Sequence, residues 1–240
     1  KIKRAPMLFG KKEHLVGLDI GSRTIKAAEI ADTTKGRTLK RFGMVDITPG
    51  LIEDGTINEP EEVAEKIKEL FKTFNIREKN VAVSIGGYSV IVKKINVQTM
   101  AEDQLQDTIH FEAEQYIPFD ISDVNLDFQI LGPNENNPNQ MNVFLVAAKK
   151  ELVDNKLALL ADAGLGAAVI DVDAFALHNA FERNYPEAME GIVALVNVGH
   201  EVTNVNILEE GVPILTRDIP FGSRRVREDL QRERGLTAEQ

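Results

Sequence analysis

The sequence predicts an α/β protein built from a duplicated domain, because one strand–turn–strand pattern occurs twice. An apolar strand runs into a polar residue and a glycine at 17–22 (GLDIGS) and again at 195–200 (LVNVGH), and a second β-rich run follows each. Gly21 and Gly199 are too far apart for a small repeat, which indicates duplication of a whole domain. Strands and helices alternate between the copies, as in layered α/β folds.

In the first copy, the strand ending at Ile20 is followed by expected strands at 25–30 and 38–47. A helix is predicted from Pro60, since proline suits the first helical turn and apolar residues then recur on one face. A buried strand is expected at 81–85. It ends at Gly86-Gly87, which we interpret as a bend rather than a third phosphate loop.

A separate unit is expected from Lys94. We predict that Thr99 caps its helix with Glu102 as the capping-box partner, and that Pro118 ends it. Strands at 125–131 and 141–148 are expected to flank a solvated loop, 132–140. A helix at 150–163 should follow, closed by Gly164.

The chain is then expected to return as a strand at 166–170 and a helix after Asp173. Asp171 and Asp173 lie where strand meets helix and are candidates to act on a ligand, although an N-cap role is favoured for Asp173. The second copy predicts strands at 202–208 and 212–219, and a helix after Gly222-Ser223.

The two glycine tips predict a site for a phosphate chain. Glycine permits positive φ and lets backbone N–H groups approach an anion that a Cβ would keep away. Either tip alone is typical of an ordinary hairpin, and two tips in matching strand contexts favour a nucleotide.

These residues resemble the actin-like ATPases and, more closely, the PilM family of type IV pilus assembly. Sequence patches in family order carry the resemblance: 7–12 (MLFGKK), 15–22 (LVGLDIGS), 115–120 (QYIPFD), 171–177 (DVDAFAL) and 216–222 (TRDIPFG). The resemblance implies duplicated ribonuclease-H-type domains with an inserted small α+β subdomain. The expected first domain is 13–93 with 165–190, the inserted subdomain is 94–164, and 191–240 begins a second domain that is expected to be truncated.

The resemblance also implies a binding site for ATP and Mg²⁺. Asp19 is expected to hold the metal, directly or through water. The residues expected to contact the nucleotide are Asp19, Gly21, Ser22, Arg23, Thr24, Lys26, Asn197, Gly199, His200, Thr203 and Gly222. Asn197 stands where the family usually has aspartate, and an amide supplies no charge for a metal. We therefore expect nucleotide binding with slow or no hydrolysis, and no catalytic residue is assigned.

By the same resemblance, the expected function is that of a scaffold that binds the N-terminal cytoplasmic tail of a PilN-like inner-membrane protein in a groove beside the inserted subdomain. Other inner-membrane and motor proteins of the pilus are further expected partners, and a homo-oligomer or ring is an open alternative. Two other functions stay open: an FtsA-like division protein, and a small-molecule kinase of the same fold, for which we find no catalytic acid.

Composition restricts the functional classes. A net charge of −10 argues against nucleic acid as a partner, and the absence of cysteine excludes disulfides and thiolate zinc sites. No apolar run is long enough to span a bilayer. We therefore expect a cytoplasmic protein at the inner-membrane face that meets the membrane through its partners. Residues 1–6 precede Met7, which we interpret as the natural start.

Overall fold

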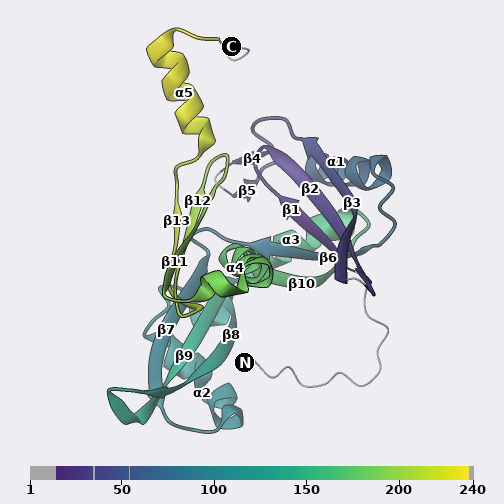
Figure 1. The fold of residues 1–240 in the computed structure, drawn as a ribbon. Coiled ribbons are helices and arrows are strands. Elements are labelled where there is room, and N and C mark those ends of the chain that lie inside the picture. Colours follow the sequence, from purple (N-terminus) through teal and green to yellow (C-terminus); the bar gives the residue numbers. More distant parts are fainter. Residues whose placement is uncertain (1–14, 35, 54, 238–240) are drawn as a thin grey trace.

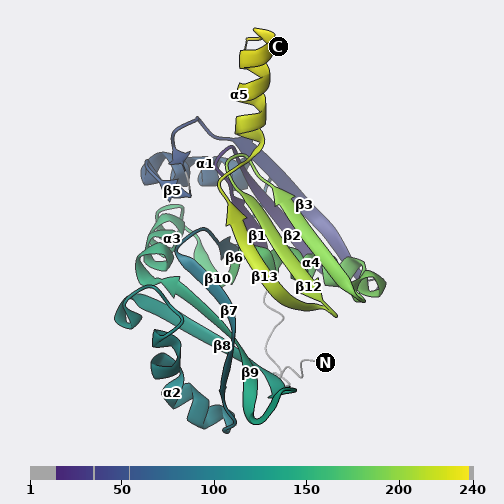
Figure 2. The same cartoon turned by 90° about the vertical axis from the view of Figure 1, so that its left-hand side faces the viewer.

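The structure is a computed structural model that describes residues 15–34, 36–53 and 55–237. One five-stranded sheet and two three-stranded sheets form its framework. Figures 1 and 2 show the sheet of the second copy standing beside the first sheet, with the middle unit at one end of both. The patch 7–12 and residue 13, the expected start of the first domain, lie outside the described residues.

The first sheet has the strand order β10-β6-β1-β2-β3. Strands β1, β2 and β3 form an antiparallel meander, whereas β1, β6 and β10 run parallel. The observed strands agree with the expected ones within a few residues. Their bounds are β1 (Val16–Ile20), β2 (Thr24–Thr33), β3 (Gly36–Asp46), β6 (Asn80–Ile85) and β10 (Gly166–Val172), and a short pair, β4 (Ile52–Glu53) and β5 (Thr56–Ile57), follows β3.

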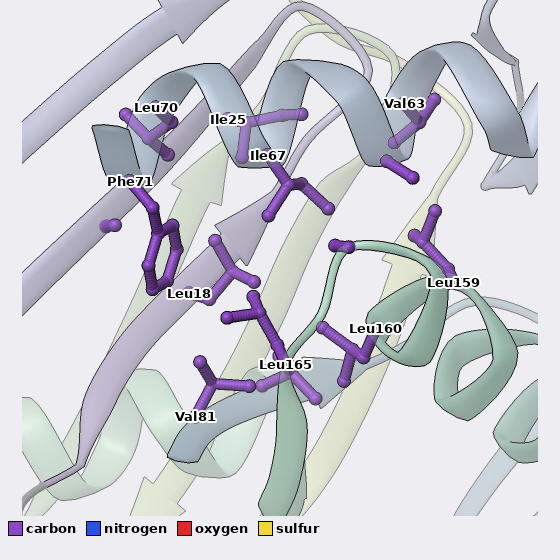
Figure 3. Packing of buried hydrophobic residues seen from close by; sticks show 14 of the residues in the cluster. Leu18, Ile25, Val63, Ile67, Leu70, Phe71, Val81, Leu159, Leu160 and Leu165 are labelled. Atoms are coloured by element: carbon purple, nitrogen blue, oxygen red, sulfur yellow. The ribbon is translucent and has the colours of Figure 1, made fainter. Parts of the chain in front are cut away.

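Helix α1 (Pro60–Thr73) buries the predicted face against this sheet. Figure 3 shows its apolar side chains pointing toward those of β1, β2 and β6. Val63, Ile67 and Leu70 are fully buried, and each such side chain contributes about 1.5–3 kcal/mol. Pro60 lies in the first turn, acidic residues follow it there, and Lys72 lies in the last turn, as the helix dipole favours.

Helix α3 (Lys150–Asp162) packs into this first core. Its Leu159 and Leu160 lie among the side chains of α1 in Figure 3. The expected inserted subdomain, 94–164, had included this helix. Strand β7 (Val90–Gln98) also begins before that range. We therefore propose that the inserted subdomain runs from 90 to 149.

The middle unit is an antiparallel sheet of order β7-β9-β8 covered by α2 (Glu102–Glu114). Leu105, Ile109 and Ala113 of α2 are buried against it, as expected, and form a second core with Ile95 and Val143. The predicted capping box is wrong. The helix begins after Ala101, whose N–H donates to the Gln104 side chain at 3.1 Å, so the back-bonding partner is two residues later than predicted.

The predicted loop 132–140 is also wrong, because most of it is paired strand. Strand β8 (Val124–Asn134) and β9 (Asn137–Lys149) stay paired up to a turn at residues 135 and 136, although the register shifts between Ile130 and Gly132 and between Pro133 and Asn134. The polar side chains of this hairpin end stay in contact with solvent while its backbone pairs, so polarity misled the prediction. A 3₁₀ turn, Ile121–Asp123, precedes β8.

The second copy forms a sheet of order β11-β12-β13: β11 (Ile192–Val198), β12 (Thr203–Glu209) and β13 (Val212–Ile219). Helix α4 (Asp173–Asn184) packs against β6 and β10 and also against β12, so it lies at the junction of the two copies. A 3₁₀ turn, Pro186–Met189, precedes β11. Helix α5 (Ser223–Arg234) projects from one end and buries none of its residues (Figure 1). Within the described residues, no helix combines the length and apolar character needed to span a bilayer.

Candidate functional site

The two hairpin tips are built alike. The Gly21 N–H donates to the Thr24 carbonyl at 3.1 Å, and the Gly199 N–H donates to the Val202 carbonyl at 2.9 Å. A Cβ on Gly21 or Gly199 would lie 3.1 or 2.7 Å from the same carbonyl. Neither glycine has a positive φ, so this part of the expected reason for glycine is wrong, and the close approach of the turn carbonyl is the reason that the structure shows. The matching bonds support equivalent roles for the two tips.

Because both glycine amides are used within the turns, other groups must donate to a ligand. The amides of Ser22, Arg23 and His200 make no backbone hydrogen bond within the part of the chain that the structure describes. Burial lowers the pKa of His200, as do the charges of Arg227 and, from the opposite tip, Arg23. The charge of Arg23 at the first tip therefore acts on the imidazole at the second tip.

Asp19 and Lys26 face each other across the first hairpin. They are paired in the ladder between β1 and β2, and the Lys26 ammonium donates to the Asp19 carboxylate at 2.7 Å. Both side chains are partly exposed, with 63% of Asp19 accessible. The carboxylate therefore faces solvent beside the first tip, where a hydrated cation can reach it.

Asp173 lies in an acidic group behind the tips. Burial raises the pKa of its carboxyl, the charges of Asp218 and Asp19 raise it further, and a hydrogen bond from Ser84 opposes them. Asp173 is the first residue of α4, while Val172 is the N-cap, so the predicted capping role is wrong. Asp171 instead accepts a bond from the Val172 amide at 2.8 Å.

Lys156 of α3 faces the same acidic group. Burial lowers the pKa of its ammonium, whereas Asp173 and Asp19 raise it. Among the described residues Lys156 makes no hydrogen bond or ion pair. A half-buried lysine and a half-buried carboxyl with a raised pKa thus lie near Asp19, which is typical of a functional site.

Asp173→Asn is expected to raise the free energy of unfolding at pH 7.5 by about 1 kcal/mol. Because the folded pKa lies above the ordinary value, the stability that this carboxyl contributes is lost as pH rises through the folded pKa. An amide carries no such penalty and still accepts the bond from Ser84. Urea unfolding at pH 7.5 and 3.5 measures the gain, which should vanish at the lower pH. An equal gain at both pH values, or the same gain in the control Asp171→Asn, would contradict this explanation.

The side chain of Asn197 belongs to a series of hydrogen bonds. Its side-chain amide donates to Asn204 at 3.1 Å, and Asn204 donates to the Asp218 carboxylate at 2.7 Å. The other Asp218 oxygen accepts the Gly87 N–H at 2.5 Å, from the turn between β6 and β7. A chain of bonds therefore runs from the second tip to the first copy.

Two predicted phosphate ligands support the second tip from behind. The Thr203 hydroxyl is buried and donates to the Phe221 carbonyl at 2.6 Å. A Cβ on Gly222 would lie 2.6 Å from the Glu201 amide nitrogen. The first amides of α5 donate to the carbonyls of Gly199 and His200, both at 2.9 Å. Thr203 and Gly222 therefore shape this tip through their own contacts with it.

Helix α5 also fixes the second tip by charge. Its Arg224 guanidinium donates to the buried Glu201 carboxylate at 2.6 Å. Arg225 pairs with Asp229 at 3.4 Å. A cavity of about 250 Å³ lies between this helix and the tip, lined by residues that include His200, Phe221 and Arg224.

A larger groove of about 560 Å³ runs between β7 and β13. Val90 to Lys94 of β7 and Pro213 to Asp218 of β13 form its two walls, and Tyr116, Pro118, Phe144 and Ala174 also line it. Strands β7 and β13 are each outermost in their sheets, so within the described residues their outer edges lack a strand partner. The groove therefore offers two strand edges and an apolar floor.

The residues at the tips fit a nucleotide with its metal. A carboxylate such as that of Asp19 is the kind of oxygen ligand that Mg²⁺ prefers, and backbone amides such as those of Ser22, Arg23 and His200 are suitable donors for phosphate oxygens. Lys26 and Lys156 supply positive charge. The Asn197 amide adds no charge, as expected from the sequence.

Sequence reasoning missed Lys156 and Asp218 as members of this site. The position of Lys156, four residues from both Leu152 and Leu160, places it on the buried side of α3 and signals an unusual lysine. Asp218 lies near the end of a strand and gives no comparable signal, because its partner Gly87 is 131 residues away.

Comparison with known proteins identifies the fold and the family that the chain resembles. A model of the type IV pilus assembly protein PilM matches residues 17–240. The chain superposes on a solved PilM-PilN type IV pilus biogenesis complex with a TM-score of 0.82 and 29% identity, covering 95% of this chain and 67% of the other.

More distant structures share the fold. The ethanolamine utilization protein EutJ from Carboxydothermus hydrogenoformans matches with a TM-score of 0.55 and 14% identity, over 95% of this chain and 60% of its own. The cytoplasmic domain of EpsL, an inner membrane component of the type II secretion system of Vibrio cholerae, matches with 0.54 and 14%, over 95% and 79%. The predicted actin-like α/β fold is confirmed.

Proposed function

Because this chain belongs to the PilM family of type IV pilus assembly proteins, we propose that it is a nucleotide-binding adaptor that holds the tail of a PilN-like protein. The observation that carries the proposal is the groove between the edges of β7 and β13. It borders the inserted subdomain, where the family resemblance leads us to expect the tail. The solved relative is itself a PilM-PilN complex.

The nucleotide part of the proposal rests on the tips. Asp19 would hold Mg²⁺, and Ser22, Arg23 and His200 would donate to the phosphates from both sides. Mg²⁺ supplies charge that neutralises phosphate oxygens when bound. Gly21 and Gly199 keep the turns tight enough for their neighbours to approach, while Lys26 balances the charge of Asp19. The chain offers no ionised base at Asn197 to orient a water, which favours slow turnover.

The peptide part rests on the unpaired strand edges. An extended peptide can add to such an edge through backbone hydrogen bonds, and pockets for alternate side chains then provide specificity. Ile91 and Ile214 lie on opposite walls of the groove, and the Lys93 ammonium lies 5.1 Å from the Tyr116 ring centroid at its border. The groove therefore suits a short extended segment with apolar side chains.

Ile214→Glu is expected to weaken binding of the tail about tenfold or more, because a buried carboxylate would face the apolar side of the peptide. Fluorescence anisotropy with a labelled N-terminal peptide of the PilN protein from the same organism measures it. Ile214 is 49% exposed, so the free protein should tolerate the change.

The matched control is Ile192→Glu, the same substitution on β11 of the same sheet, at a residue 73% exposed and outside the groove. Its affinity should equal that of the wild type. Equal losses in both variants would place the tail elsewhere, and no binding by the wild type would overturn the adaptor function.

A tail anchored in an inner-membrane protein would hold the chain at the inner-membrane face, and other pilus proteins would then meet its outer surfaces. An apolar surface for such contacts exists on strand β11 of the sheet β11-β12-β13, where Ile192, Val196 and Val198 are more than half exposed. This location and these further partners follow from the proposal.

A further inference from the structure

Asp218 joins three parts of the molecule through one carboxylate. One oxygen accepts from the Asn204 amide at 2.7 Å, within the sheet β11-β12-β13. The Asn204 side chain in turn accepts from Asn197 at 3.1 Å, next to the second tip. The other oxygen accepts the Gly87 N–H at 2.5 Å. This last bond crosses from the second copy to the turn at the end of β6.

The turn that Asp218 holds leaves little room for movement. A Cβ on Gly86 would lie 3.1 Å from the Asp173 Cγ and 3.4 Å from an Asp218 oxygen, so both carboxyl groups pack on this glycine. Asp173 is the group whose pKa is raised by burial and by the charge of Asp218. A shift of β13 relative to β6 must therefore alter this whole contact.

The same residues form one end of the groove. Gly86, Gly87, Asp173 and Asp218 all line it, and Asp218 ends the wall that β13 provides. A ligand that moves the second tip would pull on Asn197, Asn204 and Asp218 and thereby on the groove. A peptide that separates β7 from β13 would act on the same bonds from the groove, and its effect would pass to the second tip.

We propose that Asp218 is a positioning residue that couples the nucleotide tip to the peptide groove, so that each ligand changes the affinity for the other. The inference rests on the proposed function and adds its regulation. The coupling is reciprocal, because it is a single free energy shared by both binding equilibria. Asp218 lies at the end of the groove wall, and the coupling acts through its bonds to Asn204 and Gly87.

Asp218→Asn tests the coupling with little change in shape. A carboxylate accepts from both Asn204 and Gly87, whereas an amide has one oxygen and can keep only one of these bonds. Affinity of the labelled PilN tail is measured with and without saturating Mg²⁺-ATP. We expect the wild-type affinity to change about fivefold or more on adding nucleotide, and the change in Asp218→Asn to fall below about twofold.

A second variant and a control distinguish a loss of coupling from a general loss of structure. Asn204→Ala breaks the same chain one bond earlier, so it should lose the coupling as well, and the double variant should lose no more than either single one. Asp171→Asn removes a nearby charge that takes no part in this series of hydrogen bonds, so it should keep the wild-type coupling. If Asp218→Asn fails to fold, Asn204→Ala carries the test.

The outcomes are distinct. A wild type that does not bind the tail overturns the proposed function and this inference with it. Tail binding that nucleotide does not change in the wild type overturns the inference alone. Coupling that persists in Asp218→Asn and in Asn204→Ala also overturns it.

Discussion

Asp19→Ala is expected to weaken Mg²⁺-ATP binding by at least about 100-fold, the largest effect that we foresee on ligand affinity. Loss of an outer-shell partner alone costs roughly 10–100-fold in metal affinity, and Asp19 is the residue proposed to hold the metal itself. The substitution also leaves the Lys26 ammonium, now 2.7 Å from that carboxylate, without its partner. Isothermal titration calorimetry with ATP in the presence of Mg²⁺ measures the change.

Asp32→Ala is the matched control, since it also removes a carboxylate that pairs with a basic side chain. Asp32 lies at the end of strand β2 far from the first tip, and the Arg37 guanidinium lies 3.4 Å from its carboxylate. This variant should bind nucleotide as the wild type does. A second titration with EDTA in place of Mg²⁺ should reduce the difference between Asp19→Ala and the wild type. If the difference persists without the metal, Asp19 does not act as a metal ligand.

Gly222→Ala is expected to destabilise the protein by about 1–3 kcal/mol, because the new methyl group has no space. It would lie 2.6 Å from the Glu201 nitrogen and against the His200 carbonyl, and backbone atoms cannot move aside as a flexible side chain can. The second tip must shift, so nucleotide affinity should fall as well. Chemical unfolding and calorimetry measure the two losses.

Gly17→Ala serves as the control for Gly222→Ala. Its new Cβ would meet only the Ala28 carbonyl oxygen, at an ordinary contact distance of 3.9 Å, and alanine costs less backbone entropy than glycine in a strand. Stability should stay equal or rise. Equal stability of the two variants would mean that the second tip has more freedom than its packing indicates.

Much of the fold could be predicted because its signals are local. The tips at Gly21 and Gly199, the helix from Pro60 and the strand at 81–85 depend on residues within one or two turns of each other, and all were found. Two of the errors are local as well. The predicted cap at Thr99 and the loop at 132–140 failed where polar residues allowed more than one backbone arrangement.

The site was predicted in part. Asp19, Ser22, Arg23 and His200 lie at the two tips as expected, because a hairpin fixes its own turn. Thr203 and Gly222 support the second tip, and no local pattern in the sequence distinguishes the front of a turn from its back. That distinction depends on α5, whose first amides bond to the carbonyls of the tip.

The sequence by itself determined the duplicated hairpins, the order of strands and helices, and the family, since these follow from periodicity, turn residues and motif order. Tertiary structure decided that α3 joins the first core, that desolvation shifts the pKa values of Lys156 and Asp173 near Asp19, and that Asp218 bonds to Gly87. Desolvation and charge pairing depend on all atoms around a group, and here those atoms belong to segments more than a hundred residues apart. No local pattern encodes such an environment, so only the folded chain reveals it.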